Sequence, residues 1–205
     1  MGRSATMGAL FSSWEAAASR FGEEDLLKSV RADICDTDDV LNAVREEMSA
    51  LSPAGRDLLM VRSVETPTHF KWCLAGGEHR GLRVWLHTYK PWIPGEDRHA
   101  ASIHDHRYSF VSAVLAGELR ERRWRIHEGR ITAAGDHRRP SGETYAIAHS
   151  EIHSLGAVAP GTATLLVQAP AAKPFSTVYD PASRQEKAKH FDLAHTFTHL
   201  PLLTP

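Results

Sequence analysis

Apolar residues recur at helical spacing in the first third of the chain and at strand spacing in the middle. Leu10, Trp14 and Ala18 lie four positions apart, so residues 4–63 are predicted to be helical. The acidic run at residues 36–39 indicates a new helix start inside this region, because acidic side chains favour the first turn. We expect these helices to cover one outer face of the domain that follows.

From about residue 68 to residue 167, short apolar or alternating runs are separated by turns. In residues 82–89, Val84 and Leu86 fall on one face of a predicted strand and Trp85 and His87 on the other. Glycine and proline mark most of the turns. Further strands are predicted at residues 70–74, around position 104, and at residues 110–115, 118–126, 131–133, 144–147, 153–158 and 162–167.

Many short strands with regular turn signals are typical of an antiparallel sandwich or barrel. The fold is therefore predicted to be mainly β, with an N-terminal helical segment. We divide the chain into a helical segment at residues 1–66, a β-domain at residues 67–180 and a C-terminal tail at residues 181–205. The strand pattern fades after residue 169, and we assign no metal-binding role to His190, His195 and His199.

A pair of histidines two positions apart is the main chemical signal in the chain. On a strand, His104, His106 and Tyr108 point to one face and Asp105 to the other. Two imidazoles on one face can bind one metal ion, with their nitrogens ~2.0–2.1 Å from it. A third ligand is then required, and the best candidate lies downstream in residues 145–154, which include His149, Glu151 and His153. The alternative is a pair of surface histidines, since the chain contains 13 histidines.

The residues after this pair favour a metal site. A strand, the paired histidines, a strand, a glycine turn, a strand and a later lone histidine together resemble the cupin superfamily. More narrowly, Ser-Ile-His-Asp-His at residues 102–106 and Leu-Ala-Gly-Glu-Leu-Arg-Glu at residues 115–121 resemble the first motif of the cysteine dioxygenase-type thiol dioxygenases. His153 is similar to the histidine of their second motif. The resemblance covers about residues 68–170 and implies a cupin-type antiparallel β-barrel, or jelly roll.

The metal is predicted to be held by three histidines. The usual cupin glutamate would follow the histidine pair, but residues 109–114 contain no acid. Asp105 and Glu151 are the alternative carboxylates; the first should point away and the second would need a different register. The resemblance implies Fe(II) as the metal. Because imidazole binds several metals, Zn, Ni or another divalent ion is the alternative. A substrate thiolate could supply the negative charge that the ligands lack.

The resemblance implies a mononuclear non-haem Fe(II) enzyme that oxidises a small-molecule substrate, such as a thiol, with dioxygen. The alternatives are a non-oxidative metal-dependent cupin, acting as an isomerase, lyase or bond-forming enzyme, and a cupin that binds a ligand without catalysis.

Three positions depart from the thiol dioxygenase pattern. Lys71 falls near the position of the arginine that binds the substrate carboxylate, and Arg83 on the next strand is an alternative cation. Val111 stands at the position of a cysteine found in many members. The catalytic tyrosine is missing from the segment that contains Gln168. We therefore expect a substrate other than cysteine.

Other residues are predicted to line the substrate pocket. Tyr108 is assigned a catalytic role as an acid or hydrogen-bond donor, with a core tyrosine as the alternative. His87 and Gln168 are assigned to substrate binding with Lys71 and Arg83, although His87 could instead be a core histidine. In contrast, the arginines of residues 120–125 and their acidic neighbours, among them Glu121, are expected to form a solvated face.

Composition narrows the range of partners. The 205-residue chain carries a formal net charge of −1, which argues against nucleic acid or an anionic membrane as its partner. Cys35 and Cys73 are too few for a disulfide framework and lack zinc-motif spacing. No apolar run approaches the ~20 residues that span a bilayer, and no signal-peptide core is seen. We expect a cytoplasmic protein, and the sequence leaves its oligomeric state open.

Overall fold

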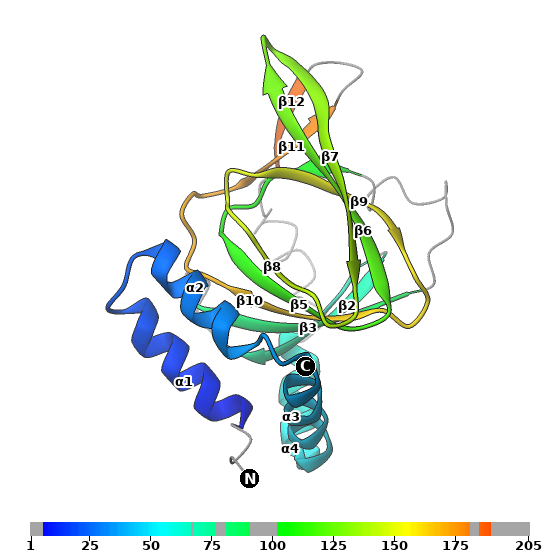
Figure 1. Cartoon of the computed structure of the whole chain (residues 1–205). Coiled ribbons are helices and arrows are strands. Elements are labelled where there is room, and N and C mark those ends of the chain that lie inside the picture. Colours follow the sequence, from blue (N-terminus) through cyan, green and yellow to red (C-terminus); the bar gives the residue numbers. More distant parts are fainter. Residues whose placement is uncertain (1–5, 67, 77–80, 91–101, 181–184, 190–205) are drawn as a thin grey trace, which may run out of the picture.

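The structure is a computed structural model that describes residues 6–66, 68–76, 81–90, 102–180 and 185–189. The described residues are mainly β, with two six-stranded antiparallel sheets and four helices. Figure 1 shows the helices grouped along one side of the sheets, with the two sheets curving around a common interior. None of the described helices combines the length and apolarity that a membrane span requires.

Four helices precede the sheets: α1 (Met7–Ala18), α2 (Glu23–Asp33), α3 (Thr37–Ala50) and α4 (Pro53–Arg62). Three of them begin with a side-chain cap, because Thr6, Asp36 and Ser52 each accept a hydrogen bond from a first-turn backbone N–H. The first turn of α2 is acidic, which suits the positive end of the helix dipole. The prediction of helices ahead of the strands is thereby confirmed.

Among the described residues, twelve strands follow and form two sheets. They are β1 (Val64–Glu65), β2 (His69–Ala75), β3 (Arg83–Tyr89), β4 (Ile103–His104), β5 (Phe110–Ala116), β6 (Glu118–His127), β7 (Arg130–Pro140), β8 (Thr144–Ile147), β9 (Ile152–Val158), β10 (Ala163–Gln168), β11 (Ser176–Asp180) and β12 (Gln185–Lys189). The first sheet has the order β1-β2-β3-β10-β5-β8, and the second has the order β12-β11-β4-β9-β6-β7.

The central strands of the first sheet, β3, β10 and β5, are largely buried on both faces. On the outer face, Val84, Val167 and Val111 are neighbours in register and pack with the helices in one apolar cluster. On the inner face, Trp85 and Leu166 are paired and belong to a second apolar cluster. Both faces of β5 are covered, which explains its continuous apolar sequence. The helices cover the outer face, as expected, and leave the inner face for the site.

The turn between β5 and β6 requires glycine. Gly117 has φ +72°, and a Cβ placed on it would lie 2.4 Å from Oγ1 of Thr162. That hydroxyl accepts a hydrogen bond from the Glu118 N–H at 3.1 Å. The motif glycine therefore lets β6 turn closely against the residue before β10.

The C-terminal part of the β-domain differs from the prediction. The pattern was expected to fade after residue 169, yet β11 pairs with β4 and β12 pairs with β11. The strand predicted at residues 131–133 extends over Arg130–Pro140 because it pairs along the whole length of β6. Both differences arise from pairing with distant strands rather than from the local pattern.

Candidate metal centre

Three histidines from neighbouring parts of the second sheet converge on one point. His104 ends β4, and its register partner on β9 is His153. His106 follows two residues later, and its Nε2 atom lies 2.8 Å from Nε2 of His153. One ligand atom from each of the three histidines lies within 4.8 Å of the others. The structure thus brings together the three residues predicted as metal ligands.

The spacing of these nitrogens fits a divalent metal ion. A tetrahedral ion ~2.0–2.1 Å from each nitrogen holds the nitrogens about 3.3 Å apart. One pair of nitrogens is 2.8 Å apart and the whole cluster lies within 4.8 Å, so the observed separations bracket that value. Small rotations of the rings would therefore bring the nitrogens to the spacing that a metal ion requires. Among the described residues, no carboxylate or thiol belongs to this cluster. The donor set is therefore three imidazoles, which suit iron, zinc or nickel.

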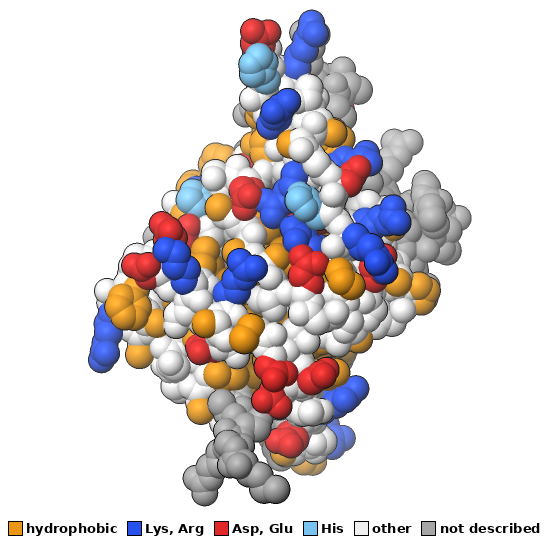
Figure 2. Space-filling model, in the orientation of Figure 1, with side chains coloured by type: hydrophobic (Ala, Val, Ile, Leu, Met, Phe, Trp, Pro, Cys, Tyr) orange, Lys and Arg blue, Asp and Glu red, His pale blue; other side chains and the backbone are white. Residues whose placement is uncertain are grey.

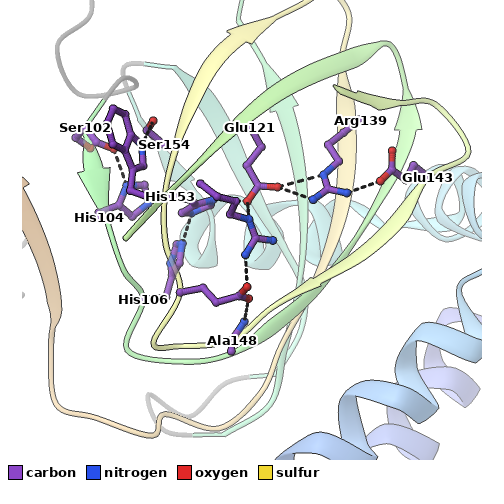
Figure 3. A network of polar contacts seen from close by, with 12 residues as sticks. Ser102, His104, His106, Glu121, Arg139, Glu143, Ala148, His153 and Ser154 are labelled. Carbon is purple, nitrogen blue, oxygen red and sulfur yellow. Dashed lines mark hydrogen bonds and ion pairs between the residues drawn. The ribbon is translucent and has the colours of Figure 1, made fainter. Parts of the chain in front are cut away.

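Two of the three imidazoles are oriented by an acceptor behind the ring. Nδ1 of His104 lies 2.9 Å from the carbonyl oxygen of Ser102, and Nδ1 of His153 lies 3.2 Å from Oε1 of Glu121 (Figure 3). A carbonyl or a carboxylate can only accept, so each Nδ1 carries the proton. The lone pair is then on Nε2 of each ring, the nitrogen left to bind a metal.

His106 is held in the neutral state by its surroundings. Burial, together with His104, His153 and Lys71 nearby, lowers the pKa of His106 well below its ordinary value. The ring centroid of Phe110 lies 4.9 Å from that of His106 in an edge-on contact. An aromatic ring thus lies beside the histidine pair, in the segment where the common cupin motif has a glutamate. The histidine cluster therefore meets an apolar ring on this side.

The expectation of a solvated face around Glu121 is wrong. This carboxylate is only 1% exposed and lies between the guanidinium groups of Arg123 and Arg139. Burial alone would raise the pKa of Glu121, but the hydrogen bond from His153 and the two arginines lower it to about 2. Glu121 shares a face of β6 with buried Leu119, and this i, i+2 relation is the sequence signal that could have revealed it.

The opposite face of the β6–β7 hairpin does match the expectation. Arg122 pairs with Asp136, and Arg138 pairs with Glu118, with both arginines exposed. Figure 2 shows basic and acidic side chains interspersed over the visible surface. Alternation along β6 therefore separates a solvated ion-pair face from a buried one.

The two alternative carboxylates are engaged elsewhere. Asp105 points away from the histidines, as expected, and accepts hydrogen bonds from the Thr177 N–H at 2.7 Å and the Tyr179 hydroxyl at 3.0 Å. Lys173 adds an ion pair to the same carboxylate at 2.6 Å. Glu151 pairs with Arg123 and accepts a hydrogen bond from a backbone N–H. Asp105 therefore joins β11 to the strand that carries His104.

Two cations lie on the inner face of the first sheet. The Lys71 ammonium lies 4.8 Å from the ring centroid of Trp85, and the Arg83 guanidinium carbon lies 5.9 Å from it. Burial and the charge of Arg83 lower the pKa of Lys71 to about 8. Because Lys71 also lowers the pKa of His106, its charge acts on the metal centre.

Two other residues predicted to line the pocket, Gln168 and His87, lie on the same inner face of the first sheet. Nε1 of Trp85 donates to Oε1 of Gln168 at 3.1 Å, so Gln168 orients the ring that faces the cations. His87 is 7% exposed, is next to Lys71 in register, and stacks on His69 with centroids 4.6 Å apart. Its buried Nε2 atom has no hydrogen-bond partner among the described residues. His87 is thus a buried histidine with one unsatisfied ring nitrogen among the described residues.

Tyr108 lies beside the histidine cluster, whereas Val111 lies away from it. The Tyr108 ring centroid lies 5.6 Å from that of His106, and burial raises the pKa of its hydroxyl. Val111 is fully buried in the apolar cluster that faces the helices, away from the histidines. His190, His195 and His199 lie outside the described residues.

No family model matches the sequence, and no curated protein matches it. Among solved structures, an oxalate decarboxylase variant of Bacillus subtilis is 15% identical with TM-score 0.40, covering 55% of this chain and 28% of its own. KdgF from Halomonas sp. is 14% identical with TM-score 0.40, covering 53% of this chain and 86% of its own. DMSP lyase DddQ from Ruegeria pomeroyi is 14% identical with TM-score 0.40, covering 59% of this chain and 58% of its own. At these values the likeness assigns neither a family nor a reaction, and function must be argued from the site itself.

Proposed function

We propose that this protein is a cupin-type metalloenzyme in which His104, His106 and His153 bind one Fe(II) ion. We propose further that it oxidises a small anionic substrate with dioxygen. The observation that carries the proposal is the convergence of three imidazoles, with no carboxylate in the cluster among the described residues, next to an interior face that bears two cations.

The charge of the ligand set supports an anionic substrate. Fe(II) supplies redox chemistry with dioxygen when bound, and three neutral ligands leave its double positive charge uncompensated. Burying such a charge is unfavourable unless a counter-charge accompanies it. A substrate thiolate or carboxylate is the group that supplies this counter-charge.

The inner face of the first sheet supports a second anionic contact. Lys71 and Arg83 flank the Trp85 ring, and the described residues place no acidic partner on Lys71. They would bind a carboxylate of the substrate, while the Trp85 ring excludes water from that side. His87 offers an unpaired nitrogen on the same face, and the hydroxyl of Tyr108 would donate a hydrogen bond or a proton near the metal.

A non-oxidative reaction is the second candidate. Three histidines with an open fourth position are also the ligand set of catalytic zinc, which acts by polarising an oxygen or activating water. Tyr108 would then serve as the acid–base group for a lyase or isomerase. The same ligand set thus supports two reaction classes, which the bound metal distinguishes.

Reconstitution with defined metals tests the proposal. Chelator-treated protein is loaded anaerobically with Fe(II), and oxygen uptake is followed with a panel of small thiols, thiol carboxylates and dicarboxylates. Parallel Zn(II) and Ni(II) samples are incubated with the same panel, and products are identified by mass spectrometry. His104→Ala serves as the inactive control, and exposed His137→Ala serves as the matched histidine variant.

We expect oxygen uptake with Fe(II) that His104→Ala abolishes and His137→Ala retains. Turnover with Zn(II) but not Fe(II) would refute the oxidation and favour the second candidate. Failure of the wild-type protein to bind any of the three metals would refute the metal centre itself.

A further inference from the structure

The carboxylate of Glu121 occupies an unusual position behind one metal ligand. It is 1% exposed, and it accepts from Nδ1 of His153 at 3.2 Å through Oε1. The same oxygen forms an ion pair with Arg123, and Oε2 accepts from Nε and Nη2 of Arg139 at 3.1 and 2.9 Å. Figure 3 shows this chain of contacts running from the histidines to the arginines. The carboxylate therefore links the metal centre to a buried ion-pair cluster.

We propose that Glu121 is the positioning residue of the metal centre, which fixes the tautomer and ring orientation of His153 and thereby raises metal affinity. The inference rests on the proposed function only in its metal site, not in the substrate or the reaction.

The two arginines hold the carboxylate of Glu121 in place from two sides. Arg123 lies directly opposite His153 in the β6–β9 register, and Arg139 reaches over from β7. Glutamates 143 and 151 pair with the outer ends of these arginines. The buried cluster thus fixes the position of the acceptor behind His153.

A purely structural role predicts a different behaviour from a positioning role. Removing Glu121 leaves two arginines without a buried counter-charge, so a loss of stability follows in either case. Only the positioning role predicts that the loss of metal affinity depends on the presence of His153. Acceptors behind metal-bound histidines are typically worth ~10–100-fold in metal affinity.

The experiment compares Glu121→Gln with Glu143→Gln as a matched control. Glu143 bonds the same guanidinium of Arg139 at 2.5 Å, but no described contact joins it to His153. Zn(II) affinity is measured by competition with a chromophoric chelator, and folding of the metal-free proteins is checked by circular dichroism. Each substitution is also made in a His153→Ala background, which closes a double-mutant cycle.

We expect Glu121→Gln to weaken Zn(II) binding by ~10–100-fold and Glu143→Gln to change it by less than about 3-fold. In the His153→Ala background, Glu121→Gln should add almost no further loss. A folded Glu121→Gln protein with wild-type affinity, or equal losses with and without His153, would overturn the proposal. Absence of Zn(II) binding by the wild type would instead refute the metal site.

A second measurement on the wild type does not depend on any variant folding. Long-range ¹H–¹⁵N correlation spectra of the metal-free protein report which nitrogen of each imidazole carries the proton. We expect His153 to be protonated on Nδ1. The opposite tautomer would contradict the proposed hydrogen bond to Glu121.

Discussion

Lys71→Met removes a cation that lies 4.8 Å from the Trp85 ring on the inner face of the first sheet. Burial and the charge of Arg83 lower the pKa of Lys71 from 10.5 to about 8. Such a lowering costs the folded state up to ~3 kcal/mol at neutral pH. Because the side chain is only half-buried, solvent screening reduces this to ~1–2 kcal/mol. The cation–π attraction between Lys71 and Trp85 offsets ~0.5–1 kcal/mol of this cost to the folded state.

The variant is therefore expected to be more stable than the wild type by about 1 kcal/mol at pH 7, which raises Tm by ~2–4 °C. The sign follows from the lowered pKa: between pH 8 and 10.5 the unfolded state keeps the proton that folded Lys71 has lost. Wild-type stability thus rises with pH across this window. The difference in stability between the variant and the wild type should therefore be smaller at about pH 9.5 than at pH 7.

Urea denaturation at pH 7 and at about pH 9.5 measures the stability difference between variant and wild type and its change with pH. Lys28→Met is the control. Lys28 is exposed and pairs with Glu24, so its loss should bring no gain in stability. A Lys71→Met protein that is less stable at pH 7, or whose advantage does not change with pH, would refute the reasoning. With a substrate in hand, the same variant should raise KM more than it lowers kcat.

Three other outcomes are expected. His104→Ala or His153→Ala should remove most of the bound metal from a folded protein, whereas exposed His137→Ala should not; metal analysis that finds full content in both site variants would place the site elsewhere. Asp105→Asn should lower the free energy of unfolding by about 2–4 kcal/mol, because the carboxylate binds the Thr177 N–H and a lysine; an unchanged urea midpoint would contradict this. Iron-loaded protein should oxidise L-cysteine ~10²-fold or more below ordinary enzyme rates, because the acid–base tyrosine of thiol dioxygenases is missing. Sulfinate formation at ordinary rates would show that this departure has no consequence.

Local pattern was sufficient for the features that depend on one strand or one helix. Alternation in residues 82–89 indicated that Trp85 and His87 share a face, and both lie in the inner rows of the first sheet. The two-residue spacing of His104 and His106 predicted a shared side; β4 ends at His104, but the structure still places both histidines beside His153. Helical periodicity likewise predicted the helices that cover the outer face. Side-chain direction along a regular element follows from backbone geometry, which the sequence determines locally.

Only the tertiary structure decided which polar groups are buried and what they contact. The segment that forms β11 shows no distinctive pattern, and it is ordered by pairing with β4 and by the carboxylate of Asp105, more than 70 residues away. Glu121 lies in a run of charged residues, yet it is buried because β9 and β7 bring His153 and Arg139 against it. A charged residue is stable in the interior only when it has partners, and the partners that distant strands supply are invisible to a local pattern. The sequence thus determined the candidate metal ligands, and the packing of the second sheet determined what lies behind them.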